Sequence, residues 1–137
     1  MADCLFCKMV RREISSEIIR EDEHTLAFLD IRPRAPGHAM VIPKVHAPQL
    51  TDLPDAEIGP LFTAVKAVAL RLTEILKPDG MTIGMNQGEA SGQVVGHLHV
   101  HLLPRYDGDG GGAIQSVVGN PGPEAPAEIA KRLRVGI

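Results

Sequence analysis

The feature that most constrains this chain is the segment from His97 to Leu103, in which three histidines alternate with aliphatic residues. Successive side chains of an extended strand point to opposite faces. The alternation therefore predicts a strand with His97, His99 and His101 on one face and aliphatic side chains on the other. Two strand rises of about 3.3 Å place successive histidines roughly 6.6 Å apart. We expect this strand to run over residues 94–103.

A row of imidazoles has more than one chemical use. Imidazole changes charge near neutral pH and can act as nucleophile, base or acid. A neutral imidazole can attack phosphorus, while its neighbours fix its tautomer and donate hydrogen bonds to phosphate oxygens. Three histidines are equally a common zinc-binding set. They can also be half-buried structural side chains or a chance polar face, so the triplet alone leaves these alternatives open.

The rest of the chain predicts an α+β protein. Apolar residues at three- and four-residue steps predict one long helix over 55–76, which Pro78 ends. The other patterns predict strands over 14–20, 25–29, 39–42 and 81–85 and short helices over 5–12 and 124–134. Residues 104–123 hold six glycines and three prolines, which is typical of an irregular loop. We expect one domain over residues 1–137 with a mostly antiparallel sheet.

Composition argues for a small-molecule partner. The net charge of -3 gives no basic excess for a nucleic-acid partner, and the chain has only three Phe, one Tyr and no Trp for base stacking. No apolar run approaches the length of a membrane span, and the first residues do not resemble a signal peptide. The two cysteines are too few for a disulfide scaffold. We therefore expect a cytoplasmic protein that binds neither nucleic acid nor membrane.

The cysteines form a C-x-x-C pair, Cys4 and Cys7. In a cytosolic chain this spacing indicates metal binding or redox chemistry. The redox version needs a strand-to-helix context of the thioredoxin type, which is missing here. A metal pair and two free thiols remain the alternatives from the spacing alone.

Several segments together resemble the HIT (histidine triad) family. They are the histidine segment 97–103, the loop Asn86–Gln93 with its Asn-x-Gly and Gly-Gln pairs, Phe28–Ile31, and Gly37-His38 followed by Val41–Lys44. The resemblance covers the chain from about Leu5 to Arg105. It implies an α+β, HIT-like fold with an antiparallel sheet of about five strands, one long helix packed across it and short terminal helices. Relatives of this kind are commonly homodimers with the long helix and a sheet strand at the interface.

The resemblance also implies roles for the histidines and one aspartate. His99 would be the nucleophile that attacks the α-phosphorus and carries a transient nucleotidyl group. His101 would contact phosphate oxygens or assist the leaving group, with His97 beside them. Asp30 would accept hydrogen bonds from the ribose hydroxyls; otherwise it is a turn residue. His38 either supports the triad or is a structural histidine.

Other positions would form the nucleotide pocket. By resemblance, the slot for the nucleobase is lined by Phe6, Met9, Phe28 and Ile31, although ordinary core packing explains such apolar residues equally well. Asn86, Gly92 and Gln93 would approach the phosphate. At the next position familiar members carry Ser or Thr, whereas this chain has Val94. A contact at that position would have to come from the backbone N–H.

Some HIT proteins, chiefly bacterial ones, bind a structural zinc through a cysteine pair of this kind. The resemblance then implies Cys4, Cys7, His46 and His97 as ligands. Such a closed Cys₂His₂ set would be structural and would not be required for the chemistry. It would leave His99 and His101 free.

The implied activity is hydrolysis of a purine nucleoside 5′-phosphoramidate or a related AMP conjugate through a nucleotidyl-histidine intermediate. Cleavage of dinucleoside polyphosphates and transfer of the nucleotidyl group to another acceptor use the same nucleophile. A nucleotide-binding regulatory module is the alternative from a different functional class.

Overall fold

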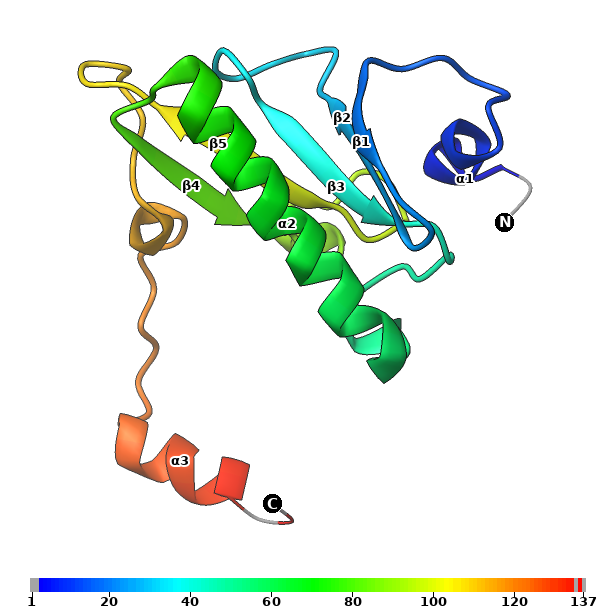
Figure 1. The fold of residues 1–137 in the computed structure, drawn as a ribbon. Helices are drawn as coiled ribbons and strands as arrows, with labels where there is room; N and C mark the ends of the chain where they lie inside the picture. Colours follow the sequence, from blue (N-terminus) through cyan, green and yellow to red (C-terminus); the bar gives the residue numbers. More distant parts are fainter. Residues whose placement is uncertain (1–2, 135, 137) are drawn as a thin grey trace.

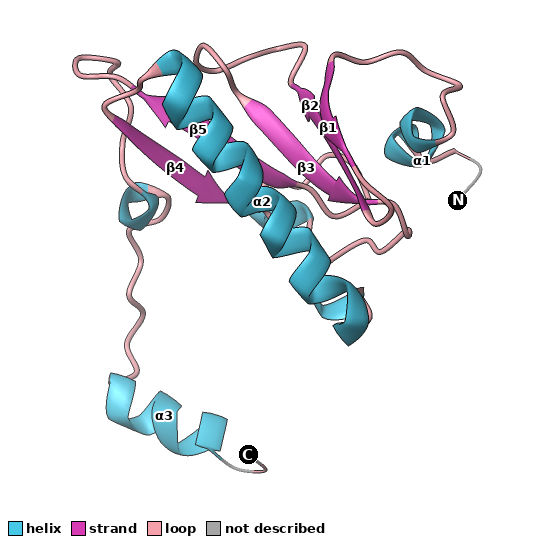
Figure 2. Cartoon of the chain, viewed as in Figure 1, coloured by secondary structure: helices cyan, strands magenta, loops and turns pink. Residues whose placement is uncertain are grey.

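The computed structural model describes residues 3–134 and residue 136. Its centre is a five-stranded antiparallel sheet in the order β1-β2-β3-β5-β4, with the helix α2 packed across one face (Figures 1 and 2). The elements are α1 (Leu5–Val10), β1 (Ile18–Glu21), β2 (Thr25–Leu29), β3 (Ala39–Pro43), α2 (Asp55–Leu76), β4 (Gly80–Gly84), β5 (Val100–Arg105) and α3 (Pro126–Arg134). The predicted α+β class, with five antiparallel strands, one long helix and short terminal helices, is confirmed.

The helix α2 buries one apolar stripe against the sheet. Its members recur at three- and four-residue steps, from Leu61 through Val65 and Val68 to Leu72. They pack in one cluster with the inward side chains of β3 and β5. The helix ends at Leu76 because Lys77 takes a left-handed conformation (φ 49°) and is followed by a proline.

The opposite face of the sheet is covered over β2 and β3 by the short helix α1. Phe6 and Met9 of α1 pack in a second cluster with the outward side chains of these two strands, among them Phe28 and Met40. α1 ends at Val10, shorter than predicted. Because α1 does not extend over β5, the odd-numbered side chains of that strand have room to form a site.

The main difference from the sequence prediction concerns the histidine strand. β5 begins at Val100, which pairs with Val41, and not at residue 94. The ladder ends there because β3 closes with Pro43, which has no N–H to donate to a continuing strand. The backbone N–H of Leu98 bonds instead to the carbonyl of Ala47 at 2.7 Å. The histidine segment is therefore half strand and half anchored loop.

The C-terminal part also begins later than predicted. β5 continues through Pro104 to Arg105, so the irregular segment starts at residue 106 and contains one short 3₁₀ turn, Ile114–Ser116. Figure 1 shows α3 standing apart from the sheet at the end of this segment. Among the described helices, none is both long enough and apolar enough to cross a lipid bilayer.

Candidate active site and metal site

The three histidines lie on the predicted face. Leu98, Val100 and Leu102 point into the core cluster under α2, whereas the intervening imidazoles point to the face that α1 partly covers. The ring centroids of His99 and His101 are 5.0 Å apart. Leu98, Val100 and Leu102 are at most 2% exposed, so the backbone that carries the imidazoles is anchored in the hydrophobic core.

His99 has one ring nitrogen fixed and the other free. Its Nδ1 lies 2.7 Å from the backbone carbonyl of His97, and because a carbonyl can only accept, Nδ1 carries the proton. The edge of its ring also packs on Phe6, with centroids 5.2 Å apart. Nε2 has no hydrogen-bond partner among the described residues, yet it is not sealed from solvent, since only Ser16 Oγ is both fully buried and unpaired. In the neutral ring of His99, Nε2 is thus the nitrogen without a proton and has a fixed orientation, which is what a nucleophilic imidazole requires.

His101 is oriented by a chain of hydrogen bonds. The backbone N–H of Arg34 donates to Nδ1 of His38 at 3.2 Å, so the proton of His38 is on Nε2. That nitrogen lies 2.9 Å from Nδ1 of His101 and donates to it. The proton of His101 is consequently on Nε2, which points away from this chain of bonds. His38 therefore holds the ring of His101 in place and leaves the Nε2–H of His101 outside this chain of bonds.

Burial keeps these two imidazoles neutral. Burial first, and then the neighbouring His99 and His38, together lower the pKa of His101 to about 4, against the opposing charge of Asp30. Burial also lowers the pKa of His38. Near neutral pH the site therefore offers hydrogen-bond donors and acceptors of defined direction rather than cations.

This shift makes stability depend on pH. Folded His101 resists protonation down to about pH 4, whereas an ordinary imidazole takes a proton near 6.5, so the unfolded state binds more protons within that window. We expect the free energy of unfolding of the wild type to fall as pH drops from 6.5 to 4. In His101→Gln this slope should be smaller than in the wild type by roughly 1 kcal/mol per pH unit. Urea unfolding at a series of pH values measures both slopes. The partly exposed His24→Gln is the reference, and a slope in His101→Gln identical to that of wild type would contradict the assignment.

Asp30 lies at the end of β2, beside these histidines. One of its carboxylate oxygens is 3.6 Å from Nε2 of His38. Phe6, Met9 and Phe28 are buried in the cluster under α1, so in this structure they are core residues at the wall of the site, while Ile31 is 82% exposed. The apolar wall and a carboxylate therefore adjoin the imidazoles on the side of β2 and α1.

The loop before the triad is braced by its own side chains. Oε1 of Gln93 accepts the backbone N–H of Gly88 at 2.8 Å, and its Nε2 donates to the carbonyl of Pro48 at 2.7 Å. Gly92 has a φ of 101°, a conformation that favours glycine. Val94 is 93% exposed, and the side chain of Asn86 makes no hydrogen bond with the described residues. The structure thus gives Gln93 a bracing role within the loop rather than a free side chain.

The cysteine pair meets two histidines at the other end of the triad. Sγ of Cys4 and Sγ of Cys7 lie 3.4 and 3.5 Å from Nδ1 of His97, and Sγ of Cys7 lies 3.3 Å from Nδ1 of His46. All four ligand atoms are within 4.8 Å of one another. Nε2 of His97 donates to the carbonyl of Pro43 at 2.8 Å, which leaves its Nδ1 unprotonated and facing the sulfurs.

These residues fit a tetrahedral zinc ion. Zinc bonds of about 2.3 Å to sulfur and 2.1 Å to nitrogen give sulfur–nitrogen edges of about 3.6 Å, close to the observed separations. Burial, with a contribution from Cys4, raises the pKa of Cys7, so a cation would stabilise the thiolate that the fold alone disfavours. Of the triad, only His97 belongs to this set. The three imidazoles do not converge on one centre, so the arrangement favours a structural metal over a catalytic one.

Comparison with known proteins agrees with this geometry. The model of the HIT domain matches residues 11–108. A Saccharomyces cerevisiae protein named adenosine 5′-monophosphoramidase is 41% identical over 106 residues, which cover 77% of this chain and 65% of that protein.

Solved structures agree as well. A HIT family protein from Bacillus subtilis has a TM-score of 0.83 at 36% identity, covering 96% of this chain and 92% of that one. A Zn-bound histidine triad family protein from Mycobacterium smegmatis has a TM-score of 0.75 at 39% identity, covering 80% of this chain and 79% of that one. The fold, the histidine row and the matched region lead to one conclusion: the chain belongs to the HIT family.

Proposed function

We propose that this protein hydrolyses purine nucleoside 5′-phosphoramidates or related AMP conjugates through a nucleotidyl intermediate on His99. The observation that carries the proposal is the fixed tautomer of His99, in which Nε2 of the neutral ring has no proton and no hydrogen-bond partner among the described residues, on a rigid support. The yeast relative named as a phosphoramidase supports the same reaction class.

The proposed reaction has two displacements at phosphorus. Nε2 of His99 bonds to the α-phosphorus as the bond to the leaving amine breaks, and the amine takes up one proton. Water then attacks the same phosphorus, the bond to His99 breaks, and one proton is returned, giving AMP and the free amine. Positive charge on the modified imidazole is stabilised because its Nδ1–H points at the carbonyl of His97. Nε2–H of His101 would donate to a phosphate oxygen.

The rest of the pocket supports the binding of a nucleoside. Asp30 would accept the ribose hydroxyls, although its Oδ1 already accepts the backbone N–H of Arg32 at 2.8 Å, as in a turn. The wall formed by Phe6, Met9 and Phe28 would face the base, with exposed Ile31 closing over it. Asn86, Gly92 and Val94 would border the phosphate from the loop side. A structural zinc on the cysteine pair, His46 and His97 would fix α1 and the start of the triad, and the chemistry itself would need no cofactor.

A substrate comparison tests this proposal against its closest alternative. We expect the hydrolysis of adenosine 5′-phosphoramidate to have a higher kcat/KM than the cleavage of diadenosine polyphosphates. It should also exceed the kcat/KM for transfer of AMP to another acceptor. A preference for the polyphosphates would leave His99 as the proposed nucleophile but would change the proposed reaction to dinucleoside polyphosphate hydrolysis. Tight AMP binding with neither substrate cleaved would favour a nucleotide-binding regulatory module.

The residue at position 94 should set part of the rate. Val94→Ser would restore the hydroxyl that familiar members carry, and one added hydrogen bond to the phosphate or leaving group should raise kcat/KM for the phosphoramidate by about two- to tenfold. The melting temperature should not change, because the Val94 side chain is 93% exposed. Val94→Ala is the matched control, and an equal gain in that variant would mean that the hydroxyl has no role.

We also propose a cytoplasmic homodimer. Among the described strands β4 is an edge strand with one unpaired side, and α2 carries exposed apolar side chains such as Phe62 and Leu70. Both are the elements expected at the interface of relatives. Light scattering on the purified protein measures the mass directly, and a monomer at micromolar concentration would contradict this part of the proposal.

A further inference from the structure

The cysteine pair of the metal site also has a geometry that suits oxidation. Cys4 is the N-cap of α1, and its Sγ accepts the backbone N–H of Cys7 at 3.4 Å. Both sulfurs lie beside Nδ1 of His97 and are within 4.8 Å of each other. A C-x-x-C pair at the first turn of a helix is the arrangement in which thiol–disulfide oxidoreductases form their bridge. The two sulfurs are thus placed to bond with each other as well as with a metal.

One of the two cysteines can be reached from solvent. A cavity of about 410 Å³ is lined by Cys4 and His46 on one side and by residues 94–96 on the other. Val94 is 93% exposed, so the cavity opens to solvent beside it. Cys7 is buried and does not line the cavity. A small oxidant therefore meets Cys4 first, with Cys7 behind it.

No other thiol competes for an oxidised Cys4 within the chain. The sequence has two cysteines in all, and neither is bridged. A sulfenic acid on Cys4 condenses with a thiol, and the thiol nearest to it is that of Cys7. Because Cys7 is buried, it reacts with its neighbour more readily than with a second molecule. The expected product of mild oxidation is a bridge between residues 4 and 7.

Such a bridge would remove the ties between α1 and the histidines. Metals bind thiolates, so two sulfurs joined in a disulfide no longer hold a metal together with His46 and His97. A loop closed over so few residues restricts the unfolded chain little, and it does not replace ties to residues far along the sequence. The ring of Phe6, between the cysteines, packs on the rings of His97 and His99 with centroids 5.9 and 5.2 Å apart. Oxidation should therefore loosen the wall that contacts His99.

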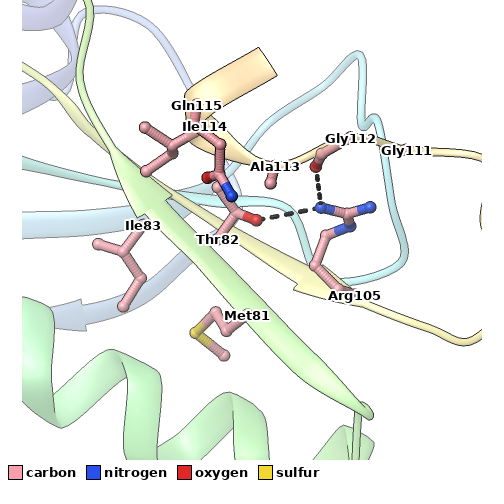
Figure 3. A pocket seen from close by; sticks show the side chains of 9 residues that line it. All are labelled: Met81, Thr82, Ile83, Arg105, Gly111, Gly112, Ala113, Ile114 and Gln115. Atoms are coloured by element: carbon pink, nitrogen blue, oxygen red, sulfur yellow. Dashed lines mark hydrogen bonds between the residues drawn. The ribbon is translucent and has the colours of Figure 1, made fainter. Parts of the chain in front are cut away.

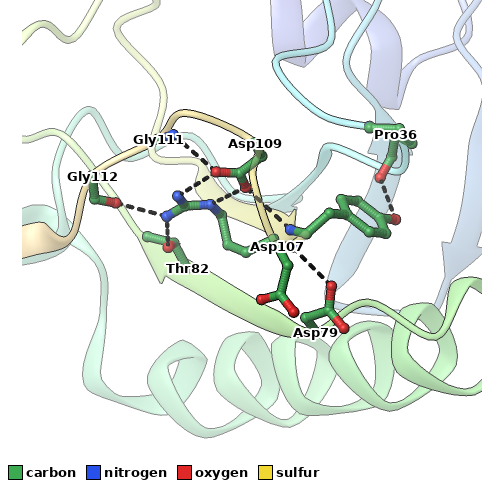
Figure 4. A network of polar contacts seen from close by, with 9 residues as sticks. Pro36, Asp79, Thr82, Asp107, Asp109, Gly111 and Gly112 are labelled. Atoms are coloured by element: carbon green, nitrogen blue, oxygen red, sulfur yellow. Dashed lines mark hydrogen bonds and ion pairs between the residues drawn. The ribbon is translucent and has the colours of Figure 1, made fainter.

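The other end of β5 is held independently of α1. Nη1 of Arg105 donates to Oγ1 of Thr82 at 3.2 Å and to the carbonyl of Gly112 at 2.7 Å (Figure 3). Its Nε and Nη2 donate to the two carboxylate oxygens of Asp109 at 2.7 and 2.9 Å (Figure 4). None of these partners belongs to α1 or to the metal site. Loosening at α1 should therefore leave this end of the strand unchanged.

We propose that Cys4 and Cys7 form a peroxide-sensitive site whose oxidation releases the metal and weakens nucleotide binding. Sγ of Cys4 attacks one oxygen of a hydroperoxide, so that a sulfur–oxygen bond forms, the oxygen–oxygen bond breaks and the other oxygen leaves as water or an alcohol. Sγ of Cys7 then attacks the sulfur of Cys4, the disulfide forms and the hydroxyl leaves as water. Two electrons pass from the sulfurs to the hydroperoxide, and the protons come from the thiols or from solvent. The effect on nucleotide binding rests on the proposed function, whereas the oxidation does not.

Treatment of the zinc-loaded protein with a small excess of hydrogen peroxide tests this site. We expect the peptide that holds both cysteines to lose about 2 Da, with release of one zinc per chain to a chromogenic chelator. The melting temperature should fall by about 10 °C or more, and the Kd for AMP should rise at least about fivefold. A thiol reductant followed by zinc should reverse these changes, whereas zinc alone should not. Zinc alone should restore protein that was stripped by a chelator instead of oxidised.

Two variants and an exchange experiment locate the effect. Cys4→Ser has one thiol and forms no internal bridge, so its peptide should not lose mass under the same treatment. His99→Ala should lose the same mass and the same zinc, because His99 is outside the pair. Hydrogen–deuterium exchange in oxidised wild type should rise over residues 3–10 and 94–99 and stay unchanged over residues 105–112.

The outcomes separate the oxidation from the nucleotide chemistry. Cysteines that keep their mass, or that gain oxygen atoms without forming a bridge, would overturn the inference. A bridge that leaves the melting temperature and the exchange of residues 94–99 unchanged would overturn the link to the active site. If the bridge forms and zinc is released but the reduced protein binds no AMP, the oxidation stands and the proposed function is wrong.

Discussion

Replacing His99 with alanine should lower phosphoramidate turnover by about 10³-fold or more while AMP still binds. The large loss follows from the two-step mechanism, because without the imidazole no nucleotidyl intermediate forms and water must attack the conjugate directly. Binding should persist, since Asp30 pairs with His38 and since Phe6, although it packs on the His99 ring, is also held in the cluster with Met9 and Phe28. Steady-state kinetics give the first effect and calorimetric titration with AMP gives the second.

A matched histidine makes the result specific. His24 is distant from His99 in the sequence, and its partly exposed ring pairs with Glu57 at 3.1 Å. His24→Ala should therefore keep wild-type turnover. Rapid quenching of wild-type enzyme with substrate should reveal a mass increase of one nucleotidyl group, absent from His99→Ala. Turnover in His99→Ala that equals wild type would show that His99 is not the nucleophile.

The fold could be predicted because its signals are local. The alternation around His99, the stripe of α2 and the proline after it are patterns of neighbouring residues, and the structure confirms the elements that they predict. The start of β5 could not be predicted in this way. It depends on Pro43 of another strand, whose missing N–H ends the ladder before the aliphatic alternation ends.

The site, like the fold, has parts that local sequence patterns predict and parts that depend on contacts between distant residues. The spacing indicated which histidines share a face, but the tautomers of His99 and His101 depend on a backbone carbonyl and on the N–H of Arg34, which no pattern encodes. The resemblance was needed to connect Cys4 and Cys7 with His46, since ligands distant in sequence meet only after folding.

Removing the metal should loosen the active site as well as lower stability. A helix of six residues does not persist alone, so α1 depends on its packing and on the ligands at its start. Phe6 lies between Cys4 and Cys7 in the chain and packs on the ring of His99. Treating the zinc-loaded protein with a chelator should lower its melting temperature by about 10 °C or more and weaken AMP binding at the same time.

Cysteine substitution separates a structural metal from a nonspecific effect of the chelator. Cys7→Ser should have a low melting temperature and weak AMP binding before any chelator is added, and added zinc should restore the treated wild type but not this variant. Elemental analysis should find one zinc per chain in wild type and none in Cys7→Ser. His99→Ala should retain its zinc, because His99 is outside the Cys4, Cys7, His46 and His97 set. Wild type without bound metal, and with a melting temperature that zinc does not change, would show that the cluster is a pair of thiols packed against two histidines.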